Sequence, residues 1–157
     1  MALDPTAQEQ NIRSSLKKFF KEELGANNIP VLFDRNITDP YTPSVSGTMA
    51  TKWVTVSFGP LDLQGMSDFS INVTCFTRQD SEGVELSKLK DLVLSLLVDE
   101  EQTDSCKRID LFDVSCTPWR RISSFLVIRG RESKQFEVVD GTKAKILPVR
   151  LKWGAAI

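Results

Sequence analysis

The segment from residue 69 to residue 98 constrains the fold most, because its hydrophobic period changes from two to 3.6 partway along. The first part alternates apolar and polar residues, as a strand with one buried face requires, with Phe69, Ile71, Val73 and Cys75 on the apolar side. Residues 78–83 then form a polar cluster of turn and cap residues. Beyond it the apolar residues recur on one face of a helix: Leu86, Leu89, Val93, Leu96 and Leu97. A strand that leads directly into such a helix predicts a helix packed across a sheet.

A second amphipathic helix is predicted near the N-terminus. Asp4 and Pro5 supply a capping side chain and a proline at the first helical position. An apolar stripe follows, and it consists of Ile12, Leu16, Phe19, Phe20 and Leu24. Gly25 is expected to end this helix, because glycine is favoured just past the last helical turn.

The remaining apolar runs predict short strands at residues 31–33, 53–58, 109–114, 122–129, 136–138 and 145–153. Gly59-Pro60 and Gly65 indicate a turn, and residues 59–65 are too few for a crossover helix, so the flanking strands should be antiparallel. Pro148 has no N–H to donate and predicts an edge strand or a bulge. The sequence therefore predicts a single α+β domain over residues 1–157, mainly an antiparallel sheet with two amphipathic helices packed on it.

Two segments stand out from this regular pattern. Residues 34–52 form a long polar loop in which Arg35 and Tyr41 could anchor a partner, although the same loop could be a simple connection. The charged run around Gly130 predicts a protruding hairpin at about residues 129–145, with Asp140-Gly141 as a turn.

The chain offers few groups for catalysis. It contains no histidine, which rules out Ser-His-Asp and Cys-His arrangements, and its three cysteines form no C-x-x-C pair. Neither a P-loop nor a G-x-G-x-x-G motif is present. Asp110 and Asp113 flank apolar residues and are weak candidates for binding a cation. We therefore expect no catalytic, cofactor-binding or metal-binding residues and no enzymatic activity.

The charges are unevenly distributed along the chain despite a net charge of −1. Residues 80–113 hold ten acidic and four basic residues, a net of −6, whereas residues 114–157 hold nine basic and three acidic residues, a net of +6. Separate acidic and basic regions would suit contacts between protein subunits, but the charges could equally be scattered over solvated faces. Nucleic-acid binding, with Trp119 and Phe136 stacking on bases, is disfavoured by the acidic pI of about 5.6.

The order of the predicted elements resembles the tail-terminator proteins of long-tailed bacteriophages. The resemblance rests on the N-terminal helix leading to Val31-Leu32-Phe33, the strands at 53–58 and 69–77, the helix after Glu85, and the final antiparallel strands ending near Trp153. It covers most of the chain as a pattern without a diagnostic motif. The chain departs from the family in a longer stretch between Ile122 and Asp140 and in a more basic C-terminal third.

The resemblance implies a structural protein of the virion that assembles in the host cytoplasm. Identical subunits would form a ring, typically a hexamer, that caps the tail tube and joins it to the head connector. The implied partners are copies of itself, the tail tube protein and a head–tail connector or neck protein, with a tail sheath protein as a further candidate. Neither a membrane nor specific nucleic acid is an expected partner.

Exposed loop residues commonly carry binding, so they are the candidates for contacts in such an assembly. Arg35 and Tyr41 would serve one set of contacts, and Arg120, Arg121, Arg129 and Arg131 would serve the other. Two alternatives remain open. The first is another neck, head-completion or baseplate adaptor protein, and the second is an enzyme that uses carboxylates and a divalent cation.

Overall fold

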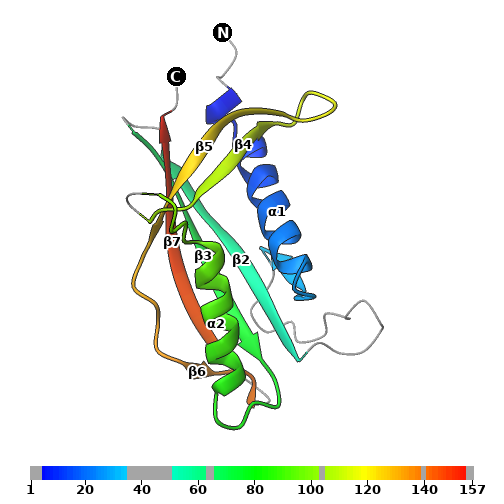
Figure 1. Ribbon diagram of the computed structural model, residues 1–157, viewed down its shortest axis with the longest axis vertical. Coiled ribbons are helices and arrows are strands. Elements are labelled where there is room, and N and C mark those ends of the chain that lie inside the picture. Colours follow the sequence, from blue (N-terminus) through cyan, green and yellow to red (C-terminus); the bar gives the residue numbers. More distant parts are fainter. Residues whose placement is uncertain (1–4, 35–50, 63–65, 103–104, 139–140, 155–157) are drawn as a thin grey trace.

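A computed structural model describes residues 5–34, 51–62, 66–102, 105–138 and 141–154 (Figure 1). A 3-10 turn, η1 (Pro5–Ala7), precedes helix α1 (Glu9–Gly25), and helix α2 (Val84–Leu96) follows the third strand. The strands are β1 (Val31–Phe33), β2 (Lys52–Asp62), β3 (Met66–Thr77), β4 (Arg108–Asp113), β5 (Arg120–Arg129), β6 (Phe136–Glu137) and β7 (Lys143–Gly154). They form one seven-stranded sheet in the order β1-β2-β3-β7-β5-β4, with β6 beside β7. The predicted α+β class is confirmed.

The sheet is mixed and curled, which differs from the predicted mainly antiparallel sheet. Strand β1 runs parallel to β2, with Val31 opposite Val54, and the remaining strand pairs are antiparallel. A parallel pair needs a connection of a dozen or more residues, and the chain between β1 and β2 is that long. The two longest strands, β3 and β7, pair along their whole length and form the middle of the sheet.

Both helices bury their apolar faces in a single core on one side of the sheet. The alternating residues of β3 contribute Phe69, Ile71, Val73 and Cys75 to this core, as the period of two predicts. The helical stripes add residues that are almost completely buried: Ile12, Leu16, Phe20, Leu24, Leu86, Leu89 and Val93. A small second cluster of Trp53, Phe76 and Ala144 lies apart from this core.

Helix α1 packs against both edge strands, β1 and β4, and so lies across the opening left by the curl of the sheet. At the β1 side, the Arg13 guanidinium pairs with Asp34 at 2.5 Å, and Asp34 accepts the N–H of Phe58 at 3.0 Å. Burial alone would raise the pKa of Asp34, but the Phe58 N–H and Arg13 outweigh it and lower that pKa below its usual value. Helix α1 therefore covers the core and also connects the two edges of the curled sheet.

The start of α1 differs from the prediction. Pro5 begins a 3-10 turn, and the α-helix starts at Glu9 after Gln8, which makes no side-chain capping bond. Asp4, the predicted cap, lies outside the described residues. The end of the helix at Gly25 is as predicted.

Gly59-Pro60 was predicted to form a turn, but both residues lie inside β2. The pairing of β2 with β3 shifts register between Phe58 and Leu61, so the two residues form a bulge, a place where proline costs no ladder hydrogen bond. A Cβ atom on Gly59 would lie only 2.8 Å from the carbonyl oxygen of Ser70. The close approach of two strands explains the glycine.

Pro148 was predicted to mark an edge strand or a bulge, yet β7 is a central strand between β3 and β5. The Pro148 carbonyl accepts the N–H of Gly130 at 2.8 Å. Because the carbonyl and the nitrogen of one residue in an antiparallel strand point to the same neighbour, the Pro148 nitrogen also faces the chain around Gly130. The chain on that side is irregular between β5 and β6, and no ladder donor is needed there.

The predicted hairpin at about 129–145 lies along the sheet instead of protruding from it. The N–H groups of Gly130 and Ser133 donate to Pro148 and Ile146 of β7, and Phe136 pairs with Ala144. Glu132 contacts both Lys145 of β7 at 3.2 Å and Lys90 of α2 at 3.6 Å. These contacts tie the connection between β5 and β6 to β7 and α2.

Candidate interaction surface on the β4–β5 hairpin

The hairpin formed by β4 and β5 projects from the body of the molecule, at the upper right of Figure 1. The strands pair from Arg108 opposite Leu126 to Asp113 opposite Arg120, with a register shift between Leu111 and Phe112. Such bulges bend and twist a strand. We call residues 114–121, at its end, the hairpin tip.

Trp119 gives the hairpin tip an exposed aromatic surface. Its side chain is 42% exposed, and Val84 is the other large apolar residue in the described chain that is classed as exposed. The indole packs beside Phe112, with ring centroids 6.3 Å apart and the rings tilted by 47°, and Lys18 of α1 lies 5.2 Å from the centre of the Phe112 ring. Partly exposed aromatic side chains are over-represented at protein interfaces and among their energetic hot spots.

Asp113 fixes the conformation of the hairpin tip. One carboxylate oxygen accepts the Ser115 N–H at 3.0 Å and the Ser115 hydroxyl at 2.6 Å. The other oxygen accepts the Cys116 thiol at 3.9 Å and lies 3.8 Å from Arg120 Nη2. The hydrogen bonds from Ser115, followed by the smaller effect of Arg120, lower the pKa of Asp113 below its usual value despite the opposing effect of burial. The carboxylate therefore stays charged and keeps the tip ordered at neutral pH.

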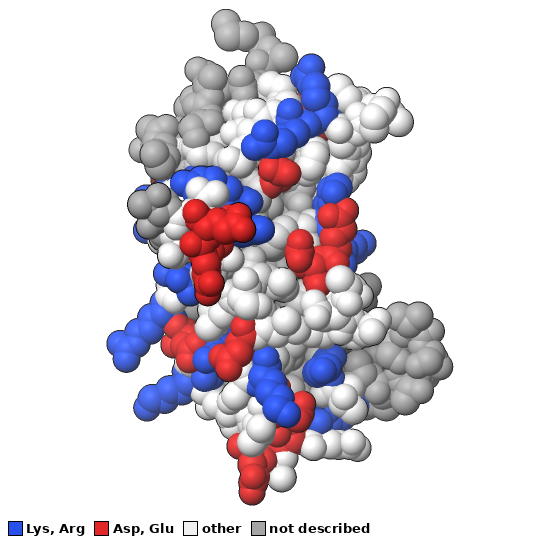
Figure 2. Space-filling model, in the orientation of Figure 1, with Lys and Arg blue, Asp and Glu red and all other residues white. Residues whose placement is uncertain are grey.

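Two arginines border Trp119 and stay open to solvent. The Arg120 and Arg121 side chains are 67% and 60% exposed. Arg121 Nε pairs with Asp110 at 2.8 Å, whereas Arg120 has only the 3.8 Å contact with Asp113. In the same region of Figure 2, basic side chains border a mostly uncharged knob. A tryptophan beside a loosely held arginine is the composition typical of an interface anchor.

Helix α1 holds the base of the hairpin through two buried side chains. The N–H of Phe112 donates to the Ser15 hydroxyl at 2.8 Å, and the N–H of Val114 donates to the Asn11 carbonyl oxygen at 3.1 Å. Both N–H groups point away from β5, at the free edge of the sheet. Exposed strand edges invite pairing with other chains, and these contacts block that mode of association here.

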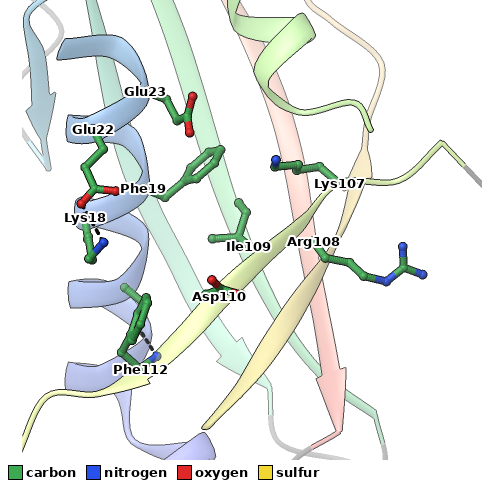
Figure 3. Close-up of a pocket in the computed structure, with 10 residues that line it drawn as sticks. Lys18, Phe19, Glu22, Glu23, Lys107, Arg108, Ile109, Asp110 and Phe112 are labelled. Carbon is green, nitrogen blue, oxygen red and sulfur yellow. Dashed lines mark hydrogen bonds and ion pairs between the residues drawn. The ribbon is translucent and has the colours of Figure 1, made fainter. Parts of the chain in front are cut away.

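A shallow groove lies between α1 and β4 (Figure 3). Phe19 and Ile109 lie in it, and charged side chains of α1, of β4 and of the residue before β4 surround it: Lys18, Glu22, Glu23, Lys107, Arg108 and Asp110. Its volume of about 180 Å³ is below the roughly 300 Å³ at which small-molecule sites begin. The acidic and basic groups balance, and Lys18 already pairs with Glu22 at 2.6 Å. The groove offers no strong recognition feature of its own.

The structure separates the residues that the sequence suggested as one binding set. Arg120 and Arg121 lie together on the hairpin tip, but Arg129 lies at the far end of β5 and Arg131 beyond it. Ten residues of strand span roughly 30 Å, so these four arginines do not form one patch. Arg35 and Tyr41 lie outside the described residues.

From the sequence, the role suggested for Trp119 was to stack on nucleic-acid bases together with Phe136. The structure does not bring the two together, because Phe136 packs against the separate cluster of Trp53, Phe76 and Ala144. Hydrophobic periodicity could not identify Trp119 as exposed. Its position beside Thr117-Pro118, a sequence break, was the available signal.

The acidic and basic segments are not separated in space as the sequence suggested they could be. Asp110 and Asp113 pair with Arg121 and Arg120, and Lys90 pairs with Glu132, so ion pairs join the two segments. Figure 2 shows red and blue side chains interspersed over the visible face. The alternative of scattered charges fits this face better.

Asp110 and Asp113, the weak cation candidates, both use their carboxylates within the hairpin. Within the described ranges, no group of three or more Cys, Asp or Glu side chains is placed to hold a metal ion.

No protein-family model matches the chain, and no curated protein matches its sequence. None of the helices in the described part of the chain combines the length and the apolar character needed to cross a membrane.

Proposed function

We propose that this protein is a structural assembly protein, a ring-forming tail terminator that caps a phage tail tube and joins it to the head connector. The proposal extends the resemblance described for the sequence. The element order supports it: an N-terminal helix, a short strand, two long strands, a second helix and closing antiparallel strands.

The observation that carries the proposal is the hairpin tip. It projects from the sheet, presents Trp119 and Arg120 to solvent, and is held in shape by Asp113. A ring of identical subunits needs a patch on each copy that meets a different patch on its neighbour. An ordered, projecting aromatic and basic element is well suited to be one of those two patches.

In this proposal the protein acts through binding surfaces. One face of the ring would contact the last ring of the tail tube protein and stop its polymerisation. The opposite face would receive the neck protein of the head. A sheath protein would be an additional neighbour in a contractile tail.

Tube polymerisation in vitro tests the proposal directly. Purified tail tube protein from the same phage is allowed to polymerise with and without this protein, and tube lengths are measured by electron microscopy. A terminator added at equimolar amounts narrows the length distribution and stops growth, with the protein found at tube ends. An unchanged length distribution, with no protein at tube ends, would refute the proposal.

Disabling the gene separates the terminator from its main competitor. Loss of a terminator yields overlong tails without heads, because nothing stops the tube. Full heads that leak DNA beside tails of normal length would instead identify a head-completion or adaptor protein.

A further inference from the structure

The strand β4 joins two different surfaces that lie on opposite flanks of the molecule. The hairpin tip follows β4, and the connection from α2 precedes it. We call residues 99–102 of this connection the acidic loop. The six residues of β4 span roughly 20 Å, and Figure 1 shows the strand running from the left flank to the projecting tip at the upper right.

The acidic loop is ordered by its own backbone. The Asp99 N–H donates to Ser105 at 3.3 Å, and the Gln102 N–H donates to Asp99 at 3.2 Å. A carboxylate oxygen of Asp99 also accepts the Glu101 N–H at 3.1 Å. An isolated bridge between Val98 and Cys106 closes the base of the loop. The backbone of residues 99–102 therefore forms a hydrogen-bonded turn.

Two carboxylates of this loop face solvent without a partner in the described part of the chain. Glu100 and Glu101 are both exposed, and neither takes part in an ion pair there. Close to them in sequence, Leu96 at the end of α2 and Val98 are only half-buried, so each leaves part of an apolar side chain open to a partner.

We propose that the hairpin tip of one copy docks on the acidic loop of a second copy, with Arg120 between Glu100 and Glu101 and Trp119 against Leu96 and Val98. The two surfaces are complementary. The tip has the exposed Trp119 ring and the loosely paired Arg120. The loop has two carboxylates without an ion pair among the described residues, and two half-buried apolar side chains precede them in the sequence. This inference rests on the proposed function and names the contact that would build the ring.

The position of the two surfaces makes the contact head-to-tail. Because they lie at opposite ends of β4, a copy that uses its tip still has its acidic loop free for the next copy. Such a heterologous contact repeats from copy to copy and closes into a ring when the rotation allows it. Pairing through the β4 edge is not an alternative there, because Asn11 and Ser15 occupy the N–H groups of Val114 and Phe112.

The native cysteines provide a cross-linking test. Cys106 lies at the base of the acidic loop and Cys116 lies in the hairpin tip, both half-buried, whereas Cys75 is fully buried. Docking brings Cys116 of one copy near Cys106 of the next, while β4 keeps the two apart within one copy. A short bismaleimide should therefore give a ladder of cross-linked species with the unmodified protein.

Two variants make the cross-linking test specific. Neither Cys106→Ser nor Cys116→Ser alone should give a ladder, and a mixture of the two should give cross-linked dimers only. A ladder that persists in Cys116→Ser, or an oligomer that shows no cross-link in the unmodified protein, would overturn the inference. Circular dichroism confirms that both variants are folded.

Charge reversal provides a second test. Arg120→Glu should weaken self-association by about tenfold or more, because it places like charges together. Adding Glu100→Arg and Glu101→Arg to the same chain should restore association. Sedimentation velocity measures both effects.

Matched controls lie near the start of α2, at the opposite end of the helix from Leu96. Lys88→Glu reverses the charge of a side chain that is 69% exposed, and Val84→Ala shortens a large apolar residue that is exposed like Trp119. Both should leave association unchanged, whereas Trp119→Ala should weaken it. Failure of the triple variant to recover association, or equal effects of Lys88→Glu and Arg120→Glu, would contradict the contact.

The outcomes distinguish this inference from the proposed function. A closed ring that persists in Arg120→Glu and in Trp119→Ala would refute the contact between tip and acidic loop but would still agree with the proposed ring. A protein that stays monomeric even with tube protein present would remove both. If the tip variants leave the ring intact but abolish binding to tube ends, the tip contacts the tube protein, and the contact between copies is wrong.

Discussion

Ser15 and Asn11 offer the sharpest test of how the candidate surface is held in place. Each residue is 1% exposed; Ser15 accepts the N–H of Phe112 at the free edge of β4, and Asn11 accepts that of Val114 just past the end of the strand. We expect that Ser15→Ala destabilises the protein although alanine is the better helix former, because the change leaves the Phe112 N–H without its acceptor.

The magnitude follows from two opposing effects. A buried N–H without a partner costs about 1–3 kcal/mol, and replacing serine by alanine within a helix returns roughly 0.5 kcal/mol. The net loss for Ser15→Ala is therefore about 0.5–2.5 kcal/mol, which lowers Tm by roughly 1–10 °C in a chain of this size. Asn11→Ala loses two bonds, one from the Val114 N–H and one to the Pro5 carbonyl at 3.0 Å, and should cost about 2–4 kcal/mol.

Urea unfolding followed by tryptophan fluorescence measures these changes, with Ser14→Ala as the matched control. Ser14 sits one position earlier on the same helix and is only half-buried, so its replacement should leave stability unchanged or slightly higher. Equal stability of Ser15→Ala and Ser14→Ala would refute the role assigned to the edge contacts. A second readout is hydrogen exchange, in which the Phe112 amide should lose protection in Ser15→Ala alone.

Three further predictions follow from the fold. Gly59→Ala should destabilise the protein by about 1–3 kcal/mol in chemical denaturation, because the new Cβ would lie 2.8 Å from the Ser70 carbonyl oxygen. Gly25→Ala is the control: its Cβ would meet nothing within 4 Å, so this change should be neutral or stabilising. Burial raises the pKa of the Cys75 thiol to about 12, so mass spectrometry should show that it resists maleimide at pH 8 until the protein unfolds. Burial alone would raise the pKa of Asp80, but hydrogen bonds from Leu86, Thr77 and Glu85 outweigh it and lower that pKa below 3.8. The unfolded chain therefore binds more protons in acid, and the free energy of unfolding should fall as pH drops through and below about 3.8. Asp80→Asn should reduce this loss. A difference in stability between the two proteins that does not change with pH would contradict the prediction.

Local hydrophobic patterns predicted the elements of the fold well where one face is buried. The alternation from Phe69 to Cys75 and the helical stripe from Ile12 to Leu24 both lie in the core as expected. Their burial follows from period alone, because strands and helices place every second residue, or every third and fourth residue, on one side.

Pairing partners were harder to predict, because they depend on segments far apart in sequence. Pro148 indicated an edge strand or a bulge, but the irregular connection between β5 and β6 needs no backbone N–H from this position of a central strand. Gly59-Pro60 indicated a turn, but the pairing of β2 with β3 shifts register there and makes the two residues a bulge. In both cases the prediction used only the local sequence, whereas the observed structure depends on a segment of the chain that lies beside it in the fold.

The candidate surface was only partly accessible to sequence reasoning. Arg120 and Arg121 were identified as exposed charges, but Arg129 and Arg131 were grouped with them because they are near in sequence. An extended strand separates neighbours in sequence by more than 3 Å per residue, so a charge run along it does not form a patch. The ion pairs from Asp110 and Asp113 to the two arginines also depend on the β4–β5 register, which the sequence did not specify.

The mass of the purified protein in solution tests the central claim most directly. The chain has a mass of 17.6 kDa, so native mass spectrometry of a hexameric ring would give about 106 kDa. The account predicts one closed oligomer of identical subunits, alone or on addition of tail tube protein. A species that remains at 17.6 kDa under both conditions would contradict it.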